Sequence, residues 1–117
     1  MKKTVVFDFD GVIHSYTSGW MGTEWIPDAP VIGIKEVIET LRSNGYEVVV
    51  VSTRCSTESG KMAVIQWLDR EGIVVDAVKK EKPPALVYID DRVICFDGDA
   101  SKLPEKIYSF EPWMNQK

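Results

Sequence analysis

The stretch YEVVVVS at residues 46–52 constrains the fold more than any other part of this chain. Its consecutive valines do not alternate with polar residues, so a strand built from them must be covered on both faces. Strands of this kind occur in parallel sheets, whose crossover connections lie against the sheet. The stretch therefore predicts an α/β protein with a parallel sheet.

The rest of the chain alternates strand and helix patterns around this stretch. Short apolar or β-branched runs predict further strands at residues 4–7, 73–78, 86–91 and 93–96. Apolar residues at helical spacing predict one helix through Ile34, Val37, Ile38 and Leu41, and a second from about Thr57 to Glu71 with Met62, Ile65 and Leu68 on one face. A last short helix is expected within SKLPEKIYSF. This order predicts a three-layer α/β sandwich with a mainly parallel central sheet.

The composition suits one soluble domain. The chain has 117 residues, of which 44% are hydrophobic and 27% charged, so we expect a single domain over residues 1–117. A net charge of −4 lacks the basic face of a general nucleic-acid binder and leaves room only for a small basic pocket. Two cysteines without a CxxC motif indicate reduced thiols in a cytoplasmic protein, and no apolar run suits a signal peptide or a membrane helix.

Acidic and hydroxyl side chains stand where three of the predicted strands end. Asp8 and Asp10 follow the first strand, Ser52 the second, and Asp90 and Asp91 the fourth. The carboxyl ends of parallel strands meet at one edge of the sheet, where ligands collect. Two unit charges about 4 Å apart repel by roughly 4 kcal/mol at an effective dielectric near 20, so gathered carboxylates need raised pKa values or a cation. Carboxylate oxygens suit Mg²⁺, which also shares substrate phosphate, so we predict a Mg²⁺ site for a phosphate ester.

The same residue types suit phosphoryl transfer. A carboxylate can attack phosphorus and form an aspartyl-phosphate, and an acid two residues on can protonate the leaving oxygen and later activate water. A hydroxyl and a lysine can hold the phosphoryl oxygens, while a metal ion neutralises the remaining charge. The candidates are Asp8, Asp10, Ser52, a lysine between residues 79 and 82, and the pair Asp90 and Asp91.

Three stretches carry these residues in order over residues 4–92, namely DFDGVIH, VVVVSTR and KPPALVYIDDR. The first resembles motif one of the haloacid dehalogenase (HAD) superfamily, DxDGx at the end of the first strand. The second resembles motif two, an apolar strand ending in Ser or Thr, and the third resembles motifs three and four combined. The resemblance implies a Rossmann-like HAD core, and an acid at position 10 favours phosphatase over dehalogenase chemistry because an alkoxide leaving group needs a proton.

The resemblance also implies a role for each matching residue. Asp8 would be the nucleophile and a metal ligand, and Asp10 the general acid/base, with its backbone carbonyl on the metal. Asp90 and Asp91 would complete the metal site, with Asp91 favoured as the direct ligand. The other assignments are Ser52 for the phosphoryl group, Lys82 as the favoured lysine with Lys79 and Lys80 left open, and Gly11, His14, Thr53 and Arg54 for substrate contact.

Residues 11–30 are expected to form a small flap, because neither gap between the motifs is long enough for a large cap domain. Arg54 is expected to pair with the acids as readily as with phosphate, and His14 is expected on the flap surface. Trp20 and Trp25 could stack on a base or pack the flap onto the domain. The segment FEPWM near the C-terminus could dock on the domain or on a partner subunit, so a homo-oligomer stays open.

The sequence thus predicts a Mg²⁺-dependent phosphatase. A small phosphorylated metabolite, nucleotide or sugar phosphate is the favoured substrate. The alternatives are a phosphatase of nucleic-acid ends or phosphoproteins, a non-catalytic phosphate-binding protein, and a receiver domain. A receiver places its acidic pair after the first strand, whereas here DxD comes first and the pair comes late, which disfavours that alternative.

Overall fold

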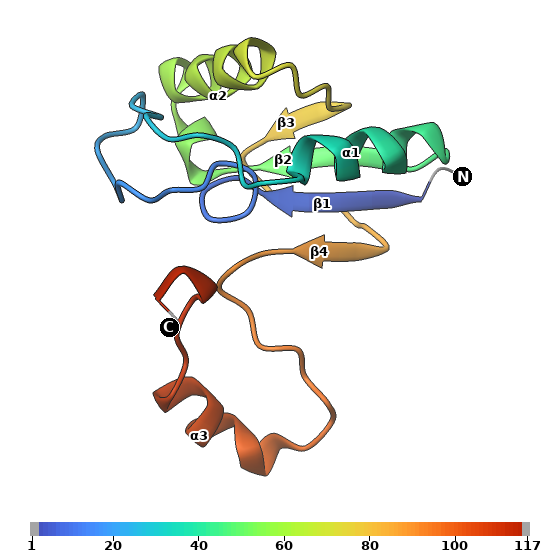
Figure 1. Ribbon diagram of the computed structural model, residues 1–117. Helices are drawn as coiled ribbons and strands as arrows, with labels where there is room; N and C mark the ends of the chain where they lie inside the picture. Colours follow the sequence, from blue (N-terminus) through green and yellow to red (C-terminus); the bar gives the residue numbers. More distant parts are fainter. Residues whose placement is uncertain (1–2, 116–117) are drawn as a thin grey trace.

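The computed structural model describes residues 3–115 and contains a four-stranded sheet (Figure 1). Every strand pairing in this sheet is parallel, and the strand order is β3-β2-β1-β4. The strands are β1 (Thr4–Asp8), β2 (Glu47–Val51), β3 (Ala77–Lys79) and β4 (Val87–Ile89). The predicted α/β class with a parallel sheet is confirmed, and the valine run forms an inner strand as expected.

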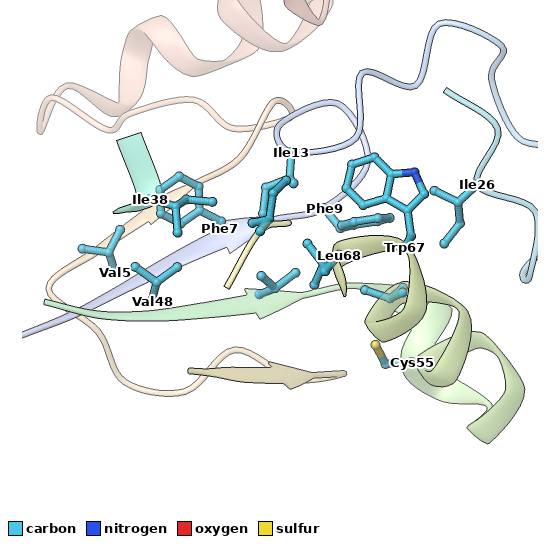
Figure 2. Packing of buried hydrophobic residues seen from close by; sticks show 13 residues of the cluster. Val5, Phe7, Phe9, Ile13, Ile26, Ile38, Val48, Cys55, Trp67 and Leu68 are labelled. Carbon is cyan, nitrogen blue, oxygen red and sulfur yellow. The ribbon is translucent and has the colours of Figure 1, made fainter. Parts of the chain in front are cut away.

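Two helices cover one face of the sheet. Helix α1 (Ile34–Ser43) and helix α2 (Glu58–Arg70) both contribute to a core that includes alternate residues of β1 and β2. Figure 2 shows this packing, in which Phe7 and Val48 lie toward Ile38, and Phe9 lies beside Trp67. The rings of Phe9 and Trp67 meet edge to face, with centroids 5.2 Å apart. This core holds the carboxyl end of β1 in a fixed place.

The opposite face of the sheet has a thinner cover. Val6, Val49 and Val51 are buried there, with Ala77 and Ala85 packed against them. Ala85 belongs to the connection that leads from β3 across β2 and β1 to β4, and this connection contains no helix. Two prolines in it, KPP at residues 82–84, oppose helix formation. The crossover therefore delivers β4 to the far side of β1 by an extended path.

Two residues at the start of helix α2 fix where it begins and how it packs. The Thr57 hydroxyl accepts a hydrogen bond from the Gly60 amide at 3.0 Å, a side-chain N-cap. Gly60 is buried against the Arg54 carbonyl, where a Cβ atom would overlap that oxygen. The expected helix of residues 57–71 is confirmed to within a residue at each end. Its start is thereby tied to the loop that carries Arg54.

Four sequence expectations need correction. Leu68 is buried as expected, but Met62 and Ile65 are exposed, and Val64 and Trp67 take their place in the core. The third strand spans only Ala77–Lys79, since Ile73 turns into the core before it. The fourth strand covers only Val87–Ile89. Residues 93–96 form no strand, because the chain has already left the sheet.

The C-terminal part lies beyond β4, away from the covering helices (Figure 1). It contains short 3₁₀ turns at Ala100–Lys102 and Trp113–Asn115 around helix α3 (Leu103–Tyr108), which confirms the expected last helix. None of the residues of α3 is buried. No helix in the described part of the chain is long and apolar enough to cross a bilayer.

Candidate functional site

Three carboxylates from two strands meet at the carboxyl edge of the sheet. Asp8 is the last residue of β1, and Asp90 and Asp91 directly follow β4. Because Phe7 pairs with Ile89 in a parallel ladder, the two strands end side by side. One carboxylate oxygen from each of the three acids lies within 4.8 Å of the others. The structure thus brings together residues that are more than eighty positions apart, as the strand pattern predicts.

Burial and the neighbouring acids raise the pKa of Asp8. Burial is the largest cause for Asp8, followed by the charge of Asp90 and the hydrogen bond and charge of Asp91, and together they raise the pKa of Asp8 to about 8. Burial also raises the pKa of Asp91. Three convergent carboxylates of this kind form a donor set that fits a hard divalent cation, which would replace the proton on Asp8.

Lys82 is the lysine that reaches this cluster. Its ammonium Nζ lies 3.4 Å from Oδ2 of Asp90 and 5.6 Å from the centre of the Tyr88 ring. Lys79 and Lys80 instead line a hollow at the end of the edge strand β3, beside Cys55 and residues at the start of α2. Of the lysines left open by the sequence, the geometry supports Lys82. Its contact with phosphate stays a prediction.

Asp10 is held apart from the other acids by Arg54. The guanidinium Nε and Nη2 atoms donate to the two oxygens of Asp10 at 2.9 and 3.2 Å. The Arg54 side chain is fully buried, and its Nη1 donates to three flap carbonyls, those of Gly22, Thr23 and Trp25, at 2.8 to 3.1 Å. Arg54 therefore fastens the flap to the motif of β1, and the acid pairing that the sequence left open is the one observed.

His14 lies on the other side of Asp10 and is fully buried, so its expected place on the flap surface is wrong. The Asp28 amide donates to Nε2 of His14 at 3.1 Å, which places the ring proton on Nδ1. Nδ1 lies 2.8 Å from Oδ1 of Asp10 and donates to it. Burial would raise the pKa of Asp10, but the hydrogen bonds from His14 and Arg54 outweigh burial and lower it.

Ser52 and Thr53 follow β2 at the same edge. Ser52 is buried, and its Oγ accepts a hydrogen bond from the Arg54 amide at 3.1 Å, so it caps the 3₁₀ turn Thr53–Ser56. The Thr53 residue is exposed. Trp20 lies over the Arg54 guanidinium, with Cζ 4.7 Å from the ring centre, while Trp25 is largely exposed. The phosphoryl contact predicted for Ser52 stays a prediction beside this capping role.

Gly11 connects the cluster to the end of the chain. Its backbone has φ +87°, and a Cβ atom there would overlap Oδ2 of Asp91. Its carbonyl accepts a hydrogen bond at 2.6 Å from the indole Nε1 of Trp113. The sequence left open where FEPWM docks, and the structure places it on the domain. Asp28 was missed because it belongs to no motif, although its amide donates to Nε2 of His14 and its Oδ2 lies 3.5 Å from that nitrogen.

Replacing Gly11 with alanine is expected to lower the free energy of unfolding by about 2–3 kcal/mol, because the new methyl group displaces Asp91 in addition to straining the backbone. Gly45→Ala is the matched control, since Gly45 has the same φ of +87° and no atom within 4 Å of the new Cβ. Urea unfolding of both variants separates the two effects. Equal losses in the two variants would show that the Asp91 contact contributes nothing.

Comparisons with known proteins identify the fold and no family. No protein-family model matches the chain, and no curated protein matches it. A crystal structure of a Vibrio cholerae protein, described only by a target designation, is similar to the chain with 20% identity and a TM-score of 0.52. The match covers 93% of this chain and 89% of that chain. At this identity the likeness supports the α/β fold alone.

Proposed function

We propose that this chain is a Mg²⁺-dependent phosphomonoesterase of the HAD type. The observation that carries the proposal is the convergence of Asp8, Asp90 and Asp91, whose oxygens lie within 4.8 Å of one another beyond parallel strands. Lys82 beside Asp90 adds a positive charge for the phosphoryl group. The DFDG, VSTR and IDDR motifs, which resemble those of the superfamily, end at or beside this edge.

The same three acids would hold the cation, and the backbone carbonyl of Asp10 is the fourth predicted ligand. A bound Mg²⁺ supplies positive charge that keeps Asp8 ionised and offsets the charge of the phosphate. Lys82 would hold a phosphoryl oxygen from the Asp90 side, and Ser52 would do so from the end of β2. Small phosphate esters of a cytoplasmic pool are the proposed substrates.

The proposed reaction uses Asp8 and Asp10 in turn. The Asp8 carboxylate attacks phosphorus, the ester bond to the alcohol breaks, and the alkoxide takes a proton from Asp10. Asp10, now a carboxylate, accepts a proton from water as the water oxygen attacks phosphorus, which releases phosphate and restores Asp8. The hydrogen bonds from His14 and Arg54 favour the ionised form of Asp10. This is the form that accepts a proton from water in the second step.

One observation favours a second candidate, a phosphate-binding protein without turnover. Both oxygens of Asp10 are engaged by Arg54 in the resting structure, so the proton donor of the first step is not free. An aryl ester needs little protonation of its leaving group, whereas an alkyl ester needs a proton from Asp10. The ratio of aryl to alkyl turnover therefore distinguishes an active Asp10 from a purely structural one.

The test is hydrolysis of p-nitrophenyl phosphate by the purified protein with Mg²⁺ and with excess chelator. We expect turnover that requires Mg²⁺ and that returns when Mg²⁺ is restored. Full activity in excess chelator would overturn the mechanism. Protein that holds Mg²⁺ yet is inert on nucleotides, sugar phosphates and phosphopeptides would favour the binding protein.

A further inference from the structure

The C-terminal turn Trp113–Asn115 is bonded to the motif that carries the candidate site. The Trp113 indole donates to the Gly11 carbonyl at 2.6 Å, across 102 positions of sequence. Gly11 in turn lies so close to the Asp91 carboxylate that a Cβ atom would not fit between them. The 3₁₀ turn Trp113–Asn115 is therefore fixed beside the acids, where the flap alone would leave the site open.

A cavity of about 330 Å³ lies between this turn and the flap. Its walls include Tyr16 and Gly19 from the flap, Arg92 after the acidic pair, and Pro112 and Met114 from the C-terminal segment. Its volume is at the lower end of the range for small-molecule sites, about 300–1,000 Å³. Asp8, Asp90 and Asp91 do not line it, but its wall residue Arg92 directly follows Asp91 in the chain.

Two features suggest that the cavity is built to hold a ligand. Tyr16 has φ 61°, a left-handed conformation that is costly for a non-glycine residue and that concentrates at functional sites. Arg92 uses its backbone amide to bind Asp90, and no carboxylate of residues 3–115 forms an ion pair with its guanidinium. The guanidinium is thus available to a ligand in the cavity.

We propose that this cavity, which we name the C-terminal pocket, binds the base of a mononucleotide whose phosphate lies at the acids. The proposal rests on the proposed phosphatase function. Tyr16, Pro112 and Met114 offer flat or polarisable apolar surfaces to a planar ring. The Arg92 guanidinium can stack on that ring and donate hydrogen bonds to its edge.

The size and apolar walls of the C-terminal pocket favour a single nucleotide over the other substrate classes. A sugar phosphate carries hydroxyl groups around its ring and offers a smaller flat apolar face to this wall than a base does. A longer nucleic acid would need a basic track for further phosphates, and the chain has a net charge of −4. A single nucleotide needs one ring-sized pocket beside one phosphate site, which is what the flap and the C-terminal segment enclose.

The test compares two alkyl phosphates, uridine 5′-monophosphate and glycerol 3-phosphate, in the full-length chain. In Arg92→Ala, and separately in Trp113→Phe, which loses the indole N–H, we expect kcat/KM for the nucleotide to fall about tenfold or more. For glycerol phosphate we expect a change within about twofold, because it does not fill the pocket. Tyr108→Ala, on the exposed surface of α3, is the control and should change neither.

A binding measurement separates this inference from the proposed function. Titration calorimetry of uridine monophosphate and glycerol phosphate into Mg²⁺-loaded Asp8→Asn protein reports the pocket without turnover. Tighter binding of the nucleotide, lost in the added Arg92→Ala change, would support the pocket even if the wild-type protein hydrolysed nothing. Equal binding of the two ligands, or a nucleotide preference that survives both substitutions, would overturn the inference while leaving the phosphatase proposal intact.

Discussion

Replacing Asp8 with asparagine is expected to abolish phosphatase activity and to stabilise the metal-free protein. Activity should fall by about 10⁴-fold or more, because the amide cannot attack phosphorus. Stability should rise because folding buries Asp8 and places it beside Asp90 and Asp91, and burial first and these acids second raise its pKa to about 8 from an ordinary value of 3.8. One substitution therefore separates the reaction from the fold.

The stability gain has a defined pH dependence. Below about pH 4, Asp8 is protonated in both the folded and the unfolded chain, so the two proteins should be similar. As the pH rises toward 8, the unfolded chain releases the proton while the folded chain retains it, and the wild type loses stability. Allowing for solvent screening at this partly exposed site, we expect Asp8→Asn to be more stable by about 2 kcal/mol at pH 8.

Urea unfolding at pH 5 and pH 8 in chelator measures this difference. Added Mg²⁺ should stabilise the wild type more than the variant and so narrow the gap. Asp69→Asn, an exposed acid on α2, is the control and should be neutral at both pH values. A variant that is less stable than the wild type at pH 8 in chelator would contradict the account of crowded carboxylates.

Replacing Arg54 with alanine is expected to lower the free energy of unfolding by about 3–5 kcal/mol, the cost typical of breaking a buried ion pair. The change leaves Asp10 without its main partner and releases the three flap carbonyls that Nη1 holds. Arg54→Lys should recover only part of the loss, since one ammonium group cannot bind the Asp10 carboxylate and the three flap carbonyls at once as the planar guanidinium does. Urea unfolding gives the stability, and limited proteolysis within residues 11–30 gives the state of the flap.

Arg42→Ala provides the comparison for a surface pair. Arg42 binds Asp76 at 3.1 Å, but its side chain is 36% exposed, so its loss should cost under about 1 kcal/mol. Similar losses for the Arg42 and Arg54 variants would show that the buried network does not hold the flap.

Much of the architecture could be predicted because it depends on local patterns. The valines of β2 required cover on both faces, and parallel strands had to bring Asp8 to Asp90 and Asp91. The strand limits were less predictable. Ile73 is as apolar as a strand residue, but it serves the core of the helical face, and only tertiary packing decides between these uses.

The surroundings of Asp10 could not be predicted in the same way. Arg54 stood at the right edge, but its choice between phosphate and Asp10 depends on the path of the flap, whose carbonyls complete its hydrogen bonds. His14 was misplaced because its burial comes from Phe9 and Trp67, which lie 5.6 Å away between ring centres in the folded chain. The contact with Trp67 joins residues 53 positions apart, and the sequence pattern does not show that the flap brings them together.

The strand order also determines when this molecule can become active during its synthesis. A ribosome that has released the first 80 residues has produced β1, β2, β3, both covering helices and the flap. It has not yet made the strand that ends in Asp90 and Asp91, nor Trp113. On the proposed function, a nascent chain can therefore collapse onto its helical face early and stay inert toward cellular phosphate esters until Asp90, Asp91 and Trp113 have left the ribosome.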